Sequence, residues 1–497
     1  MSQAQLRQPG VDGTHHGVTG GYGWSSQDRQ DTVELPRVVP VPRSHRRTGG
    51  VLPAWAFAAV AVLWAGLAGL VYSGRLDAVP LLGQRRAEVV EVLAAAALIG
   101  SWPHRDRRWW RRTLPVLLLA VVAAVASIAV VLRVSNTVTD AYPWSFAVWA
   151  GLVVLALAGV PLVGRRTGVL RRAGAVAALP LTVAGALLLI DQQYGVWPQL
   201  GDLLGHEHTT SAADLAQALH PPPGTVVRPP AQGVVVALDV PATRSGFRHR
   251  AGSVYLPPAY FTAARARLPV LLMLAGSLGT PASWASAGRA VSTVDRYAQA
   301  HHGLAPVLLF VDQNGSATGD TECVDGPQGN AETFLTADVS AFVSGQLELA
   351  PDPGRWGVVG FSEGGTCALD LVLRHPEVYR HVVDLGGDDR PTFGNPAHTL
   401  SALFGGSRAA LAAHDPAQLL ATRRYPGCTA WFTAGADDPR NLAIAQRFAV
   451  EAARAGMTEH EFTGVSGHNW QFASQALARI MPDLAPELGL PGTITGT

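Results

Sequence analysis

Long apolar runs occupy the chain between residues 51 and 190, and much shorter runs follow. The long runs carry few charges and come one after another: Val51–Tyr72, Ala87–Trp102, Leu114–Leu132, Trp144–Val163 and Ala173–Ile190. A helix needs roughly 20 apolar residues to cross a bilayer. Five such runs in succession do not suit the core of a soluble protein. The pattern therefore predicts a transmembrane region of about five helices at residues 51–190.

Residues 233–486 show a different pattern, in which apolar runs of strand length alternate with helical stretches. The predicted strands are Val234–Val240, Ser253–Leu256, Pro269–Leu274, Val307–Asp312, Arg355–Gly360, His381–Leu385 and Thr429–Ala434. The predicted helices include Ala282–Ala300, Val339–Leu349, Cys367–Arg374 and Leu442–Ala455. This alternation is typical of βαβ units. It predicts an α/β domain with a mostly parallel sheet, helices on both faces and an antiparallel opening pair.

The remaining segments lack apolar periodicity. Residues 1–50 are predicted to be a disordered cytoplasmic tail, and residues 487–497 a disordered C-terminal tail, because such segments cannot bury enough apolar surface to offset chain entropy. Residues 191–232 contain the proline run Pro221–Pro223 and are predicted to be a juxtamembrane linker. The globular domain is thus expected to begin near residue 233.

The distribution of arginine predicts the topology. Clusters of arginine follow the second and the fourth predicted span, at residues 105–112 and 165–172, whereas the other connections carry fewer. Positive residues favour the cytoplasmic side, so we expect a cytoplasmic N-terminus and an extracytoplasmic α/β domain at the plasma membrane. The composition, 48% hydrophobic and 15% charged, also indicates a membrane protein, and the net charge of +1 indicates no nucleic-acid partner.

The segment Gly360-Phe-Ser-Glu-Gly364 lies where a predicted strand meets a predicted helix. Gly-x-Ser-x-Gly at such a corner is the nucleophile-elbow pattern of α/β hydrolases, in which the turn is so tight that glycine is needed on both sides of the serine. The pattern by itself also arises by chance in a chain with 53 glycines. The rest of the chain supports it, and Ser362 is the predicted nucleophile.

An acid and a histidine follow Ser362 in the chain order that α/β hydrolases require. Asp437 and Asp438 come directly after a predicted strand; the spacing favours Asp438 as the catalytic acid, and Asp437 remains the alternative acid or the cap of the next helix. His468 lies about 30 residues further on, in a glycine-flanked loop. The histidine would take the serine proton and deliver it to the leaving group, while the aspartate orients the imidazole.

A tetrahedral oxyanion needs two preorganised N–H donors. The backbone N–H of Glu363, directly after the nucleophile, is the first candidate. The second is expected from the loop after the third predicted strand, Leu274-Ala-Gly-Ser-Leu-Gly279, where we select the N–H of Ser277. Both are backbone roles.

These residues resemble the esterase D-like branch of the α/β hydrolases, which includes the antigen 85 mycolyltransferases. The resemblance covers residues 233–486 and rests on five segments: Val254–Tyr260, Leu272–Ser277, Asp320–Asp325, Gly360–Cys367 and Gly467–Trp470. A multi-span anchor followed by this domain is similar to actinobacterial membrane esterases. One departure is Ala275, where many relatives have histidine in a His-Gly pair. The family contains esterases, thioesterases, acyltransferases and members without activity, so membership leaves the reaction open.

The chain has three cysteines. Cys323 and Cys367 fall in the domain that we place outside the cell, where disulfides persist, and we predict a bridge between them that ties a loop to the elbow helix. Cys428 is then expected to pack as a small apolar side chain. We expect no metal and no cofactor, because no Cys/His spacing of the metal-binding type occurs.

The sequence therefore predicts a membrane-anchored serine hydrolase that acts on lipid or cell-envelope acyl esters through an acyl-enzyme. An insertion, Arg390–Arg423, is expected to cover the site. An acyltransferase using the same triad is one alternative, and a non-catalytic envelope-binding scaffold is another. A transporter with an appended domain is a third, kept open by Glu88 and Glu91 near the second predicted span.

Overall fold

The computed structural model describes residues 65–66, 69–70, 73–81, 84–101, 107, 111–112, 114–135, 144–162, 168–204, 229–262, 267–277, 279–316 and 318–491. Within these residues, eight strands form one sheet in the order β1-β2-β4-β3-β7-β8-β9-β10. The strands are β1 (Val234–Leu238), β2 (Gly252–Leu256), β3 (Val270–Leu274), β4 (Val307–Phe310), β7 (Trp356–Phe361), β8 (His381–Leu385), β9 (Thr429–Gly435) and β10 (Thr458–Gly464). β1 and β2 pair antiparallel, as do β2 and β4, and the other pairs are parallel.

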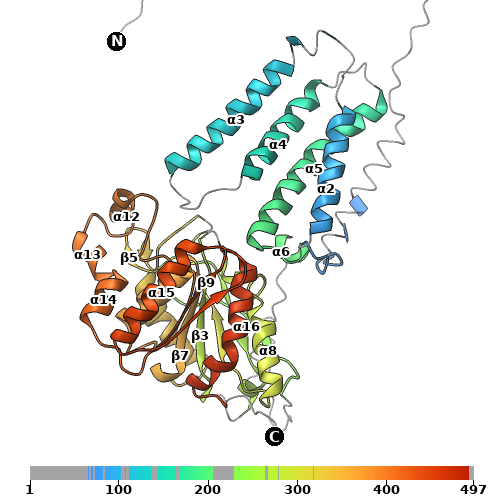
Figure 1. Ribbon diagram of the computed structural model, residues 1–497. Coiled ribbons are helices and arrows are strands. Elements are labelled where there is room, and N and C mark those ends of the chain that lie inside the picture. Colours follow the sequence, from blue (N-terminus) through green and yellow to red (C-terminus); the bar gives the residue numbers. More distant parts are fainter. Residues whose placement is uncertain are drawn as a thin grey trace, which may run out of the picture. The chain divides into compact units, whose positions relative to one another are not determined.

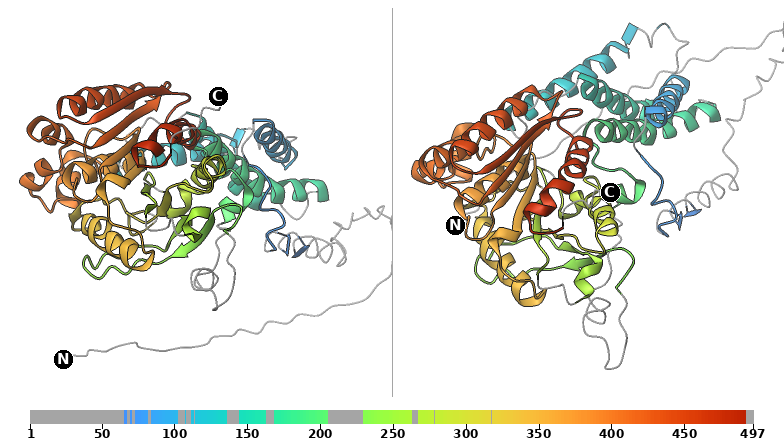
Figure 2. Two further views of the ribbon diagram at one scale, coloured as in Figure 1. Left: turned by 90° about the horizontal axis from the view of Figure 1, so that it is seen from below. Right: turned by 60° about the horizontal axis from the view of Figure 1, so that its bottom comes forward.

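Helices cover both faces of this sheet (Figures 1 and 2). One face packs against α8 (Ala290–Ala300) and α16 (Trp470–Glu487), and the other against α10 (Val339–Gln346), α11 (Glu363–Arg374), α14 (Pro416–Thr422) and α15 (Pro439–Arg454). Shorter elements are β5 (Asp325–Gly326), β6 (Gly329–Asn330), α9 (Ala331–Thr333), α12 (Pro396–Ala402) and α13 (Arg408–Ala413).

The apolar strands explain this layered architecture. Side chains alternate between the two faces of a strand, and in β3 Leu272 lies in one apolar cluster while Leu271 and Met273 lie in the other. Every residue of β3 and of β7 is buried. A strand covered on both faces reads as a continuous apolar run, which is why the central strands were visible in the sequence.

The predicted strands are all present, and their ends differ by at most two residues, but the last strand was missed. β10 has the sequence Thr-Glu-His-Glu-Phe-Thr-Gly and lies at the edge of the sheet with its residues half-buried or exposed. An edge strand that is open to solvent does not need an apolar run, so its pattern is too polar to be recognised.

Two helix predictions and one domain boundary were wrong. The predicted helix Ala282–Ala300 is divided into a 3₁₀ turn, Pro281–Trp284, and α8, with Arg289 between them at a φ of 50°. The elbow helix begins at Glu363, four residues before the predicted start. The ordered domain also continues past residue 486, because Leu488 and Leu490 are buried in the apolar core.

The N-terminal half contains α2 (Gln84–Ser101), α3 (Leu114–Ser135), α4 (Trp144–Leu162), α5 (Val169–Tyr194) and the short α6 (Leu200–Leu204). Among the described residues, one stretch, Ala173–Tyr194 within α5, is long and apolar enough to cross a membrane. Leu114–Val130 and Ser145–Ala158 are apolar but shorter. Five spans are therefore not supported. The first of them, Val51–Tyr72, falls almost entirely outside the described residues.

Candidate active site

Ser362 occupies a strained turn between β7 and α11. Its φ of 59° and ψ of −125° lie where L-residues are rarely found, and such strain is typical of functional positions. The flanking glycines are sterically required: a Cβ at Gly360 would overlap the carbonyl oxygen of Gly364, and a Cβ at Gly364 would overlap that of Leu274. The sequence motif thus forms the tight corner that projects the serine from the sheet edge.

His468 and Asp438 meet Ser362 in one hydrogen-bonded chain. His468 Nε2 lies 2.8 Å from Ser362 Oγ, and its Nδ1 lies 2.9 Å from Asp438 Oδ2. The imidazole comes from the loop between β10 and α16, and the ring of Phe361 packs against it with centroids 5.0 Å apart. Residues that are 106 positions apart in the sequence are therefore arranged for proton transfer from serine to histidine.

Asp438, and not Asp437, holds the imidazole. Asp438 also caps α15, where its side chain accepts the backbone N–H of Asn441, so the capping role considered for Asp437 belongs to Asp438 as well. Asp437 is exposed on the same loop. Burial by itself would raise the pKa of Asp438, but the hydrogen bond and charge of His468 and the N–H of Asn441 lower it below its usual value. The acid is therefore ionised when it faces the imidazole.

Asn441 is a neighbour of the triad that the sequence did not reveal. Its side-chain nitrogen donates to the carbonyl oxygen of Gly386 at 2.7 Å and lies 3.4 Å from His468 Nδ1. A single asparagine in an amphipathic helix carries no motif, and only its spatial position next to His468 identifies it.

The two candidate oxyanion donors come from residues next to the nucleophile in the sequence or in space. Glu363 is the first residue of α11, so its N–H is at the helix N-terminus, where helical N–H groups have no intrahelical partner. The loop that carries Ser277 lies directly on the serine: a Cβ at Gly276 would come within 2.9 Å of Ser362 Cβ and 3.1 Å of the carbonyl oxygen of Phe361. The assignment of these two N–H groups to an oxyanion remains a prediction.

The side chain of Glu363 points into a buried group of acids. Burial, and then the charges of Asp320 and other acids, raise the pKa of Glu363 well above its usual range, and the same causes raise that of Glu322. The pKa of Asp320 is raised to about 7, again mainly by burial. Glu363 accepts a hydrogen bond of 2.9 Å from Asn314. Burial thus favours the protonated form of these carboxyl groups and limits the negative charge behind the nucleophile.

Cys323 and Cys367 form the predicted disulfide, which joins the loop before β5 to α11. Cys428 is a buried free thiol, as expected. Among the described residues, no group of three or more His, Cys, Asp or Glu side chains is arranged to hold a metal ion.

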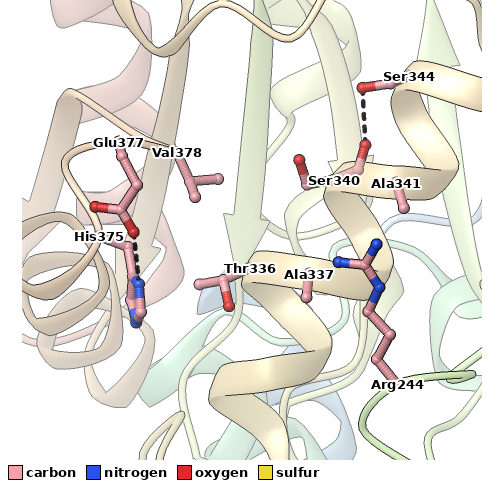
Figure 3. A pocket seen from close by; sticks show the side chains of 9 residues that line it. All are labelled: Arg244, Thr336, Ala337, Ser340, Ala341, Ser344, His375, Glu377 and Val378. Atoms are coloured by element: carbon pink, nitrogen blue, oxygen red, sulfur yellow. Dashed lines mark hydrogen bonds and ion pairs between the residues drawn. The ribbon is translucent and has the colours of Figure 1, made fainter.

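A pocket of about 370 Å³ lies beside α10 and the turn after α11 (Figure 3). Its lining comes from α10 and the residues just before it, from the turn after α11 and from Arg244. Two of its hydroxyl groups already donate to backbone carbonyls of their own helical segment, Ser344 to Ser340 and Thr336 to Glu332. No triad residue lines it.

A family model and several known proteins are similar to this chain. A family model described as "Putative esterase" matches residues 247–484. An uncharacterized protein of Corynebacterium glutamicum is 31% identical over 411 residues, which cover 80% of this chain and 94% of that protein. Among solved structures, a ferulic acid esterase is 20% identical (TM-score 0.43, 52% of this chain and 98% of that one). MPT51 (FbpC1) of Mycobacterium tuberculosis is 22% identical, with a TM-score of 0.36, and the match covers 50% of this chain and 97% of that one.

Proposed function

Since the chain belongs to the Putative esterase family of α/β hydrolases, we propose that it is a membrane-anchored serine esterase. It hydrolyses lipid or cell-envelope acyl esters on the extracytoplasmic side of the plasma membrane. The observation that carries the proposal is the chain of hydrogen bonds from Ser362 through His468 to Asp438. A protein that kept the fold as a scaffold would have no need to maintain all three side chains in this arrangement.

The proposed reaction has two halves. Ser362 Oγ attacks the ester carbonyl carbon as His468 Nε2 takes its proton, and the resulting oxyanion accepts hydrogen bonds from the N–H groups of Glu363 and Ser277. The imidazolium, stabilised by Asp438, gives the proton to the departing alcohol and leaves an acyl-enzyme. Water then attacks the acyl-enzyme with the same histidine as base. An acyltransferase differs only in that another hydroxyl takes the place of this water.

Exposed apolar side chains support membrane anchoring. Among the described residues, large apolar side chains that face outward are concentrated on α2 to α5; Ile99 is 70% exposed, and Leu119 and Val176 are each 69% exposed. Soluble proteins rarely expose contiguous apolar surface of this kind, and lipid is the environment that suits it. The span Ala173–Tyr194 precedes the α/β domain in the chain and would tether it to the bilayer.

The Cys323–Cys367 disulfide supports the extracytoplasmic placement. Disulfides persist in oxidising compartments outside the cytoplasm and are rare within it. Four arginines directly precede the span Ala173–Tyr194, and arginine favours the cytoplasmic side, so this span would place the domain that follows it outside. A site tethered close to the outer surface of the membrane meets acyl esters that are already concentrated there.

The test is labelling of intact spheroplasts with a fluorophosphonate that cannot cross membranes. We expect the wild-type chain and the control Ser474→Ala, a substitution on the exposed side of α16, to be labelled, and Ser362→Ala to remain unlabelled. Labelling only after lysis would refute the outward placement. Absence of labelling in both preparations would refute the activated serine. Product analysis with an ester and an added alcohol then separates hydrolysis from acyl transfer.

A further inference from the structure

The loop that carries Ser277 is held at both ends by side chains from outside it. Gln313 Nε2 donates to the carbonyl oxygen of Ala275 at 2.5 Å, and Arg250 Nη1 donates to that of Gly279 at 3.1 Å. Between these points, the N–H of Gly279 donates to the carbonyl oxygen of Gly276 at 2.9 Å and closes a tight turn. The described residues of this loop, 275–277 and 279, are therefore held in place in the free protein.

These hydrogen bonds determine where the loop's N–H groups point. A peptide unit is planar and trans, so fixing a carbonyl also fixes the N–H of the next residue on the opposite side. The carbonyl of Gly276 is held by Gly279, and the direction of the Ser277 N–H follows from it. Gln313 holds the peptide unit between Ala275 and Gly276, directly before this turn, and Arg250 holds the carbonyl of Gly279 at its end. Through these two points they set the orientation of the whole turn relative to Ser362.

The side chains that hold the loop are themselves rigid. Gln313 is 3% exposed, and its backbone carbonyl oxygen accepts a hydrogen bond from Thr321 Oγ1 at 2.7 Å, which holds the main chain that carries the side chain. Arg250 binds Asp312 with two nitrogens, Nε at 3.0 Å and Nη2 at 2.6 Å. Such a bidentate pair fixes the plane of the guanidinium and leaves Nη1 directed at the loop.

The three consecutive residues 312–314 are linked to the loop that carries Ser277 and to the side chain of Glu363. Asp312 acts through Arg250 on Gly279, Gln313 binds the loop at Ala275, and Asn314 donates to the carboxyl group of Glu363 at 2.9 Å. Residues 312–314 begin two positions after the end of β4, which pairs with β3, the strand that leads into the loop. The arrangement of the sheet therefore brings this segment beside the nucleophile.

We propose that Gln313 is a positioning residue for the oxyanion hole, and that Arg250 supports the same loop from its other end. This inference rests on the proposed acyl-ester reaction at Ser362. Gln313 touches no reacting atom; it acts by keeping the Ser277 N–H aimed at the oxyanion before substrate binds. A misdirected donor weakens stabilisation of the transition state while the ground state, which needs no oxyanion contact, is little affected.

The test compares Gln313→Met with Gln446→Met in the full-length protein, using hydrolysis of a p-nitrophenyl ester. Methionine has a similar length but no N–H, and Gln446 is exposed on α15 and away from the loop. Each rate is divided by the concentration of active sites, measured by titration with a fluorophosphonate. An unfolded fraction of the protein therefore does not lower the measured kcat. We expect Gln313→Met to lower kcat about 10- to 100-fold with KM nearly unchanged. The upper end of this range equals the loss of kcat expected when one oxyanion donor is removed. Gln446→Met should leave both constants unchanged.

A boronic acid, which forms a tetrahedral adduct with the serine, provides the second readout. Its inhibition constant should rise by the same factor as kcat falls, which a general loss of stability would not produce. Arg250→Met, which releases the other end of the loop, should act in the same direction, and it carries the test if Gln313→Met does not fold. Wild-type kcat and boronate binding in the folded variants would overturn the inference. An inactive wild type, or an active Ser362→Ala, would instead overturn the proposed function.

Discussion

Asp384 provides a test of the electrostatics behind the nucleophile elbow. It lies on β8, is 3% exposed, and its Oδ1 accepts the backbone N–H of Gly387 at 2.8 Å. Burial is the main cause that raises its pKa from 3.8 to about 7; the hydrogen bond from Gly387 opposes this rise, and the charge of Asp388 adds to it. The substitution Asp384→Asn keeps an acceptor for Gly387 and removes the ionisable group.

The sign of the effect follows from proton binding. Between pH 4 and pH 7 the folded protein holds a proton on Asp384 that the unfolded chain has lost, so stability falls as pH rises, by about 1.4 kcal/mol per pH unit. Over this range the wild type loses about 4 kcal/mol through this one group. The amide of the Asp384→Asn variant does not titrate, so the variant gains about 4 kcal/mol relative to the wild type as pH rises from 4 to above 7.

The assay is urea unfolding of both proteins at a series of pH values, followed by tryptophan fluorescence. The informative quantity is the difference between the two free energies of unfolding, because other buried acids such as Asp320 affect both proteins alike. Asp483→Asn, on the exposed side of α16, is the control and should give a flat difference. A flat difference for Asp384→Asn as well would show that its carboxyl is ionised without cost in the folded state, and would refute the reasoning.

Three further predictions concern the site and the disulfide. Asp438→Asn should lower kcat by about 10⁴-fold in an ester hydrolysis assay, because the imidazole loses the partner that fixes its tautomer. Asp437→Asn, the control, should have little effect on kcat. A larger loss of kcat in Asp437→Asn than in Asp438→Asn would show that the acid is misassigned. Gly276→Ala should slow fluorophosphonate labelling, since its Cβ would come within 2.9 Å of Ser362 Cβ; labelling at the wild-type rate contradicts this. Replacing both cysteines of the disulfide, which are 44 positions apart, should cost about 4 kcal/mol in urea unfolding. Cys428→Ala removes one buried sulfur atom but no cross-link and should cost less. A reductant that leaves wild-type stability unchanged would argue against the bridge.

Ser362 and His468, which the structure brings together, could be selected from the sequence because their signals are local. Only a sharp strand-to-helix corner needs glycine on both sides of Ser362, and the structure shows that side chains at Gly360 and Gly364 would overlap the backbone. His468 follows in the expected order, in its own short glycine-flanked loop. The central strands were visible for a similar reason, since strands buried on both faces must be apolar throughout.

The membrane region could be predicted only in part. Composition and long apolar runs indicated helices, and α2 to α5 are helices. Whether a helix crosses a bilayer depends on its apolar length, and among the described residues only Ala173–Tyr194 reaches that length. The distribution of arginine indicates on which side of a membrane the loops lie. It does not establish that each apolar run crosses the membrane.

The sequence by itself determined which residues could perform the chemistry, because motifs at tight turns are dictated by local sterics. Only the tertiary structure decided which of two adjacent aspartates faces His468, and that Gln313 and Arg250 hold the loop opposite Ser362. These are matters of side-chain direction between segments far apart in the chain. No local pattern encodes them, since a polar residue in a loop has the same propensity whether it faces solvent or a carbonyl contributed by another strand.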